Sequence, residues 1–192
     1  MYKIPKTFYL RENVLEISRD LLGKYIFTRI DKQLTGGIIT EVEAYAGVSD
    51  RASHAYGSRR TRRNDIMYSD GGVAYVYLCY GIHHLFNIVT NATGIPHAIL
   101  LRAIKPTQGI ETMLWRRNKL KHDKTLTSGP GSVSQALGIK TIFNGTNLTV
   151  NMILLEDRGL ITDDVRIITC PRIGVNYAGI DALLPYRFIL EI

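Results

Sequence analysis

The chain has little cysteine and no long apolar run. Its 192 residues include two cysteines, Cys79 and Cys170, which lie far apart and outside any CxxC pair. This spacing is not that of a zinc site or a disulfide framework, so a reducing environment is expected. No apolar stretch approaches the roughly 20 residues of a membrane-spanning helix, and the polar N-terminus lacks the core of a secretion signal. We therefore expect a cytoplasmic protein without a membrane partner.

Several motifs of common enzyme classes are also absent. The chain contains no P-loop and no GxGxxG segment, and it lacks the histidine, glutamate and CxxC pattern of zinc-dependent deaminases. These motifs hold nucleotide phosphates, dinucleotides and a catalytic zinc, respectively. The sequence therefore gives no support to those three kinds of chemistry.

Acidic residues are the minority among the charged ones. There are 24 Lys and Arg against 17 Asp and Glu, a net charge of +7. Such an excess favours an anionic partner, usually nucleic acid or an anionic membrane surface. Hydrophobic residues make up 45% and charged residues 21% of the chain, as in folded proteins. Because no linker, repeat or low-complexity tract interrupts it, residues 1–192 are expected to form a single domain.

Periodicity and turn residues predict more strands than helices. Helices are expected after the capping residue Asn13 as far as Gly23, over 108–118, and after the turn at 129–131. A turn is expected at 34–37. Strands are expected at 25–29, 38–45, 73–80, 85–89, 98–104 (ending before Pro106), 148–154, 165–169 and 187–190. Hairpin-type links between them predict an α+β fold on a mainly antiparallel sheet, with a hairpin over 73–89.

Two glutamates on one predicted strand are the first candidates for chemistry. Alternation over 38–45 puts Ile39, Glu41, Glu43 and Tyr45 on the same face. Glutamate is depleted in strands, so this pair calls for an explanation. The pair is a solvent-facing stripe, or it forms ion pairs with nearby arginines, or it provides a catalytic carboxylate held on a rigid element.

A basic loop follows this strand, over residues 48–65. It contains His54, Tyr56 and five arginines: Arg51, Arg59, Arg60, Arg62 and Arg63. Guanidinium groups match phosphate oxygens well, although a solvated surface loop has the same composition. A second basic stretch runs over 102–124 around Trp115. Two such segments in a small chain favour nucleic acid as the partner.

The predicted hairpin over 73–89 is rich in tyrosine. Tyr75 and Tyr77 share one face of a strand, and Tyr75 is expected to be a core residue. Tyr80 stands at the hairpin end, where an aromatic ring is well placed to stack on bases or enter a duplex. His83 and His84 are expected to be loop residues rather than metal ligands.

In this order, the segments resemble the alkyladenine (3-methyladenine) DNA glycosylase family. The similarity covers nearly the whole chain and includes Tyr75-Val-Tyr-Leu-Cys-Tyr-Gly81, Asn87 and Leu100-Leu-Arg-Ala-Ile-Lys-Pro106. Further matching segments are Glu41-Val-Glu-Ala-Tyr45, His54, Arg59-Arg-Thr-Arg-Arg-Asn64, Ser128-Gly-Pro-Gly131, Ala136-Leu-Gly-Ile139 and Arg172-Ile-Gly-Val175. One departure is Ser132, where the family commonly has a lysine, and this puts one phosphate contact in doubt.

The resemblance implies a role for each matched residue. Glu43 is expected to activate a water molecule that Arg102 positions, with the backbone carbonyl of Ile173 as a further contact. Around the flipped base the resemblance places Tyr45, His54, Tyr77 and Asn87, and Asn87 would clash with the exocyclic amine of normal guanine. Tyr80 is expected to fill the gap in the duplex. Contacts to the DNA backbone are implied for Arg59, Arg63, Ile82 and His83.

The implied enzyme is a monofunctional glycosylase acting on double-stranded DNA. It would excise 3-methyladenine and 7-methylguanine, with hypoxanthine and ethenoadenine as further candidates, and would leave an abasic site. The expected fold is a curved sheet flanked by helices, with a protruding hairpin. A monomer without metal or cofactor is expected, located at the nucleoid if the source is bacterial. Two other classes stay open: a metal-dependent nuclease using Glu41 and Glu43, and a non-enzymatic DNA-bending protein using Tyr80.

Overall fold

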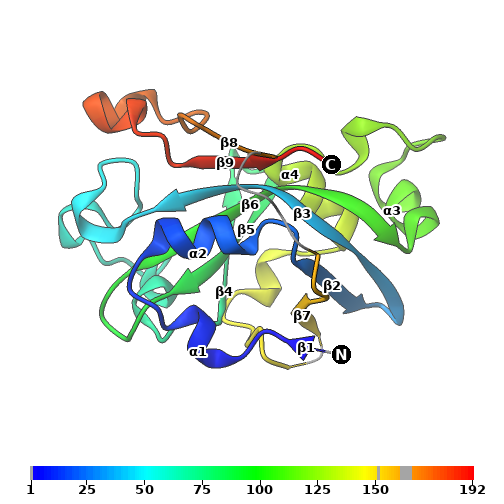
Figure 1. Ribbon diagram of the computed structural model, residues 1–192, viewed down its shortest axis with the longest axis horizontal. Helices are drawn as coiled ribbons and strands as arrows, with labels where there is room; N and C mark the ends of the chain where they lie inside the picture. Colours follow the sequence, from blue (N-terminus) through cyan, green and yellow to red (C-terminus); the bar gives the residue numbers. More distant parts are fainter. Residues whose placement is uncertain (1, 151, 161–165) are drawn as a thin grey trace.

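A computed structural model describes residues 2–150, 152–160 and 166–192. Within these residues one antiparallel sheet runs in the order β1-β7-β2-β3-β6-β5-β4, and β9 pairs with both β3 and β8. The strands are β1 Tyr2–Lys3, β2 Tyr25–Ile30, β3 Gln33–Tyr45, β4 Ala74–Cys79, β5 His83–Thr90, β6 His97–Gln108, β7 Ile153–Asp157, β8 Ile167–Cys170 and β9 Arg187–Leu190. Figure 1 shows the long strands β3 and β6 crossing the molecule as the centre of a curled sheet.

Few helices accompany the sheet, as an α+β fold requires. They are α1 Lys6–Tyr9, α2 Val14–Leu21, α3 Ile110–Arg117 and α4 Pro130–Leu137. The predicted cap of α2 is confirmed, since the Asn13 side chain accepts from the backbone N–H groups of Leu15 and Glu16. In the part of the chain that the structure describes, every helix is too short or too polar to cross a membrane.

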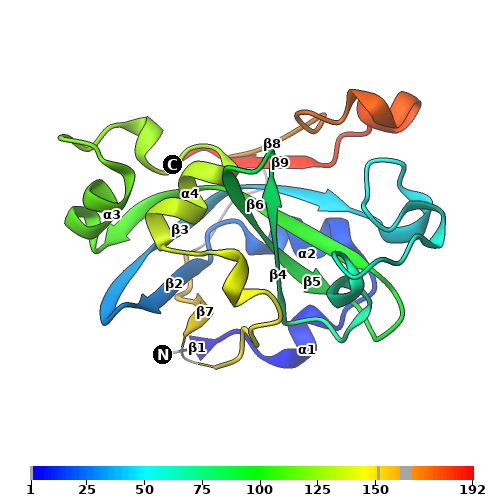
Figure 2. The same ribbon diagram turned by 180° about the vertical axis from the view of Figure 1, so that it is seen from behind.

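Two faces of the hairpin strands pack against different partners. Ala74, Ile88 and Ile99 point into the main core, which also contains apolar side chains of α2 and α4. Their neighbours Tyr75 and Val89 point to the opposite face. There a smaller cluster joins them to Ala55, Met67, Tyr68 and Ala98. The basic loop 48–65 thus covers one face of β4, β5 and β6, beside the hairpin that rises in Figure 2.

The turn predicted at 34–37 is wrong. The chain reverses at Asp31 and Lys32, whose φ angles of 54° and 60° make a two-residue hairpin turn without glycine. Gly36 and Gly37 instead lie within β3, where neighbours approach closely. A Cβ on Gly37 would lie 2.3 Å from the Lys105 carbonyl oxygen, so no side chain fits there.

Other boundaries also differ from the prediction. β5 begins at His83, so His83 and His84 lie in a strand and are not the loop residues that were expected, because the hairpin loop is shorter than predicted. β6 continues through Pro106 to Gln108, because Pro106 sits at a register shift opposite Gly37, where a missing N–H is tolerated. The helix expected from 108 therefore begins at Ile110. The strand expected over 148–154 begins only at Ile153 and runs to Asp157. Residues 151 and 165 of the expected strands lie outside the described residues.

The expected face of Ile39 is also wrong, and the reason is a β-bulge. The register between β3 and β6 shifts at Thr40, and it shifts back at Arg102. Ile39 therefore lies in the main core with Val42 and Ala44. An extra residue in one strand interrupts alternation and re-aims the side chains that follow, as happens often beside active sites.

Candidate active site

Glu43 lies at the centre of the sheet and is fully buried. It sits on β3 between two partner strands, opposite Leu100 of β6 and Arg187 of β9. Its exposed fraction is 0%, which is rare for a glutamate unless it is paired or hydrogen-bonded. The reading of these glutamates as a solvent-facing stripe therefore does not hold for Glu43.

Three donors surround the carboxylate of Glu43. The Tyr45 hydroxyl donates to Oε2 at 2.9 Å, and the Ile173 backbone N–H donates to Oε1 at 2.8 Å. Arg102 Nη1 lies 3.2 Å from the same Oε1. Together these groups fix the carboxylate in one orientation. The contact made by Ile173 is through its N–H, whereas the resemblance had implied its carbonyl as a contact of the water.

Glu41 holds Arg102 in place. Arg102 Nε donates to Glu41 Oε1 at 2.8 Å, and Arg187 Nη1 donates to that oxygen at 3.1 Å. The Arg102 side chain is 9% exposed, so its charge is largely removed from water. The two glutamates therefore differ in function within the fold: Glu43 is enclosed, and Glu41 orients the neighbouring arginine.

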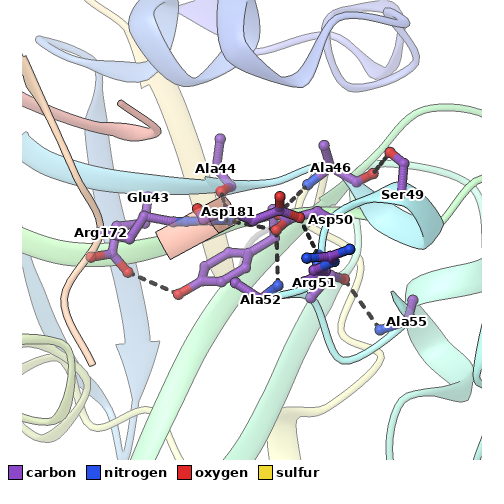
Figure 3. A network of polar contacts seen from close by, with 12 residues as sticks. Glu43, Ala44, Ala46, Ser49, Asp50, Arg51, Ala52, Ala55, Arg172 and Asp181 are labelled. Atoms are coloured by element: carbon purple, nitrogen blue, oxygen red, sulfur yellow. Dashed lines mark hydrogen bonds and ion pairs between the residues drawn. The ribbon is translucent and has the colours of Figure 1, made fainter. Parts of the chain in front are cut away.

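A buried ion pair connects the site to the C-terminal segment (Figure 3). Arg172 donates to both carboxylate oxygens of Asp50, and the two side chains are 0% and 1% exposed. Arg172 also donates to the Ala44 carbonyl at 2.9 Å, and its guanidinium lies 4.8 Å from the centre of the Tyr45 ring. Since Ile173 follows Arg172 directly, the same pair places the N–H that contacts Glu43.

An aromatic pocket opens beside this network. All four residues predicted for the base pocket line it: Tyr45, His54, Tyr77 and Asn87. The ring centres of His54 and Tyr77 are 4.7 Å apart in an edge-to-face arrangement, and Asn87 Nδ2 donates to the Tyr75 carbonyl at 3.1 Å. Because the Tyr45 ring lines the pocket while its hydroxyl reaches Glu43, the carboxylate lies at the pocket edge.

The pocket walls are uncharged at neutral pH. Burial, followed by the charges of Arg63 and Arg59, lowers the pKa of His54 to about 4. Burial, followed by the charge of Glu43, raises the pKa of Tyr45 well above its usual range. Tyr75, whose hydroxyl lies 2.7 Å from His54 Nδ1, has its pKa raised to about 12 by burial. Neutral aromatic walls suit a flat base, and they attract a cationic one through their π faces.

The side chains at the hairpin tip are exposed to solvent. Tyr80 is 92% exposed and Ile82 is 71% exposed, with Gly81 between them. A positive φ at Tyr80 and Gly81 closes the loop tightly and projects the Tyr80 ring outward. A groove of about 600 Å³, lined by Ile82 and His83, lies between the tip and α4.

The arginines of the basic loop differ in their surroundings. Arg59 has an exposed side chain, while its carbonyl accepts from Asn64 Nδ2 and the Tyr68 hydroxyl. Arg63 is also exposed, but its guanidinium lies over the Tyr77 ring at 4.8 Å. Arg102 does not belong to a basic surface with the rest of 102–124, because it is buried in the site.

Comparison with known proteins identifies the family of this chain. The family model described as methylpurine-DNA glycosylase matches residues 7–192. The chain belongs to the methylpurine-DNA glycosylase family. A protein of Chlamydia felis (strain Fe/C-56) named "Putative 3-methyladenine DNA glycosylase" is 46% identical over 98% of this chain and 96% of its own length. A protein of the same name from Bacillus thuringiensis (strain Al Hakam) is 40% identical over 97% of this chain and 95% of its own length. One from Desulfitobacterium hafniense (strain Y51) is 36% identical over 100% of this chain and 96% of its own length.

Membership in the methylpurine-DNA glycosylase family confirms the resemblance seen in the sequence. The chain is a hydrolase of N-glycosyl bonds, a DNA glycosylase for alkylated bases that acts in DNA repair. Among residues 2–150, 152–160 and 166–192, no group of three or more His, Cys, Asp or Glu side chains is arranged to hold a metal ion.

Sequence reasoning missed several residues of this candidate site. Asp50 and Arg172 were not recognised as a pair, although Arg172 opens one of the matched segments. Tyr75, expected in the core, is indeed buried but also lines the pocket with Met67. Tyr177, which completes the pocket, carries no local signal, because it reaches the site only through the path of the C-terminal segment.

Proposed function

We propose that this chain is a monofunctional glycosylase that removes alkylated purines from double-stranded DNA. Its main substrates would be 3-methyladenine and 7-methylguanine, with hypoxanthine and ethenoadenine as further candidates. The observation that carries the proposal is the buried Glu43 carboxylate at the edge of an aromatic pocket. Residues 1–192 would act as one domain and as a monomer, with the chromosomal DNA in the cytoplasm and at the nucleoid if the source is bacterial.

The proposed reaction is water attack on the sugar of a flipped nucleotide. Glu43 accepts a proton from water, the water oxygen bonds to C1′, and the bond from C1′ to the purine nitrogen breaks. The electron pair of that bond goes to the purine. The methylated purines are cationic in the nucleotide and therefore leave as neutral molecules, whereas hypoxanthine and ethenoadenine must also gain a proton to leave as neutral molecules. The sugar has oxocarbenium character at the transition state, and the Glu43 carboxylate stabilises this positive charge.

The hydrogen bonds of Glu43 leave one acceptor position for the water. An ionised carboxylate offers about four acceptor positions. Three are directed at Tyr45, Ile173 and Arg102. One position is left for the nucleophile, and Arg102 is close enough to help position it. The donors also prevent the carboxylate from rotating away during the reaction.

The lining of the pocket favours a monofunctional enzyme. A glycosylase that also cuts the strand generally uses an amine nucleophile to form a Schiff base. None of the described residues that line this pocket is a lysine. The proposed product is therefore an intact strand with an abasic site.

Base release from duplexes that each carry one defined lesion tests the proposal. We expect free modified purine and strands that break only after alkaline heating. A requirement for added divalent metal, or strand cleavage without base release, would instead support a nuclease. Binding without any base release would support a DNA-bending protein.

A further inference from the structure

The base pocket is too small for a purine as it stands. Its volume is about 40 Å³. Small-molecule sites usually offer roughly 300–1,000 Å³, and one liquid water takes up about 30 Å³. A purine can therefore enter only after part of the wall has moved.

Most of the pocket wall is held firmly. Ala52, Met67 and Ala98 are at most 2% exposed and belong to packed clusters. Tyr45 is tied to Glu43 and lies against Arg172. Tyr75 and Asn87 are 1% and 3% exposed and are joined by hydrogen bonds to neighbouring walls. His54 and Tyr77 pack against each other and against Tyr75.

Tyr177 differs from the rest of the wall. It is 70% exposed although its ring lines the pocket. Its hydroxyl donates to the carbonyl of Ala52 at 3.0 Å, and Ala52 packs against Val175 and against Ala178 of the segment that carries Tyr177. That segment, Asn176–Leu183, is a 3₁₀ turn interrupted at Gly179, where φ is 59°. A single neutral hydrogen bond contributes only about 1 kcal/mol, so the exposed Tyr177 side chain can be displaced at little cost while Val175 and Ala178 stay packed.

We propose that Tyr177 is the pocket wall that moves when the base enters, and that its ring then contacts the bound purine and helps to set the size of base that is accepted. This inference rests on the proposed function. The ring would form the solvent-facing part of the wall, because the other lining residues are more buried.

The surroundings of Tyr177 support this assignment. The pKa of its hydroxyl is raised, chiefly because the hydroxyl is partly removed from water; the charge of Arg172 opposes this shift, and the charges of Asp50 and Glu43 add to it. The segment that carries Tyr177 also contacts the carboxylate of Glu43, because the N–H of Ile173, four residues earlier, donates to Glu43 Oε1 at 2.8 Å. A neutral aromatic ring there is attracted to a cationic purine, since the ring face carries negative electrostatic potential.

The test measures product ratios from a single batch of methylated duplex DNA. 7-Methylguanine has one more ring substituent atom than 3-methyladenine, so the ratio of the two released bases reports the space in the pocket. Tyr177→Ala should raise the ratio of 7-methylguanine to 3-methyladenine about tenfold, and Tyr177→Trp should lower it by a similar factor, since a single-atom change in fit typically alters discrimination by roughly tenfold or more. Tyr177→Phe keeps the ring and should keep the ratio.

Ile180→Ala is the matched control, because Ile180 lies in the same turn, is also 70% exposed and is absent from the pocket lining. Thermal unfolding of each variant checks that the fold is retained. Ratios that stay at the wild-type value in both Tyr177→Ala and Tyr177→Trp would overturn the inference while the proposed function stands. If the wild-type protein releases neither base, the proposed function itself fails, and the inference fails with it.

Discussion

The two sides of the proposed DNA-binding face are built in opposite ways. Around Glu43 the charged groups are paired, and the side chains of Asp50, Arg102 and Arg172 are at most 9% exposed. At the hairpin tip Tyr80 is 92% exposed, and a Cβ on Gly81 would meet nothing within 4 Å. The proposed catalytic side makes its polar contacts within the protein, whereas the side chains at the tip are exposed, Ile82 by 71%.

Because of this contrast, the two regions are expected to have different functions. A preorganised polar site stabilises a developing charge without rearranging during the reaction, so changes there should affect the chemical step or the fold. An exposed aromatic tip gains contacts only when DNA is bound, so changes there should affect the DNA complex and leave the free protein intact. The predictions below test this division.

The largest effect is expected for Glu43→Gln. Losing the carboxylate removes the proton acceptor for water and the charge that stabilises the sugar cation, which should lower the rate by about 10²–10⁴-fold. Binding to lesion-containing duplex should be largely retained. Single-turnover release of 3-methyladenine measures the rate, and a wild-type rate would contradict the assignment. Glu41→Gln, the control on the same strand, should matter much less, because glutamine still offers Arg102 an acceptor.

Asp50→Ala should have the next largest effect, on stability. It leaves Arg172 buried with an uncompensated charge, which typically costs about 3–5 kcal/mol. Asp20→Ala is the matched control, since Asp20 forms a surface ion pair with Arg11 that should contribute about 1 kcal/mol at most. Denaturant unfolding of both variants measures the difference. Similar losses of unfolding free energy in the two variants would show that the buried Asp50–Arg172 pair stabilises the fold no more than a surface ion pair does.

Tyr80→Ala should impair base flipping by a smaller amount. A ring inserted into the gap left by the flipped nucleotide recovers stacking of about 1–3 kcal/mol. The free protein should unfold as the wild type does, because Tyr80 is almost fully exposed. Fluorescence of a base analogue beside the lesion reports flipping, and affinity for undamaged duplex is measured alongside. Tyr80→Phe should restore flipping. Normal flipping, together with equal losses of affinity for undamaged duplex and for lesion-containing duplex, would contradict the insertion of the Tyr80 ring into the duplex.

The contrast also explains what the sequence could predict. Tyr80 and Glu43 can be recognised from their local sequence. Tyr80 precedes Gly81 at a predicted hairpin end, and Glu43 is a glutamate within a predicted strand, where this residue type is depleted. The Asp50–Arg172 pair joins residues 122 positions apart, and Tyr177 reaches Ala52 across 125 positions, so no local pattern reports them. The bulge at Thr40 escaped prediction because alternation alone cannot place an inserted residue.

The smallest effect is expected for Arg59→Ala, on the salt dependence of DNA binding. Arg59 exposes its side chain, while hydrogen bonds from Asn64 and Tyr68 to its carbonyl hold the backbone in place. Removing the guanidinium should therefore leave the loop intact and remove one phosphate contact.

Each phosphate contact adds about −0.9 to the slope of log K against log salt concentration, so the variant's slope should be shallower by roughly one unit. Arg29→Ala is the matched control, because it removes the same charge from an exposed position on β2, at the opposite end of the sheet (Figure 1). Affinity for undamaged duplex is measured over a series of salt concentrations for both variants. Equal slopes for Arg59→Ala and Arg29→Ala would show that Arg59 contributes net charge only, and the basic loop would then lose its assigned place at the DNA backbone.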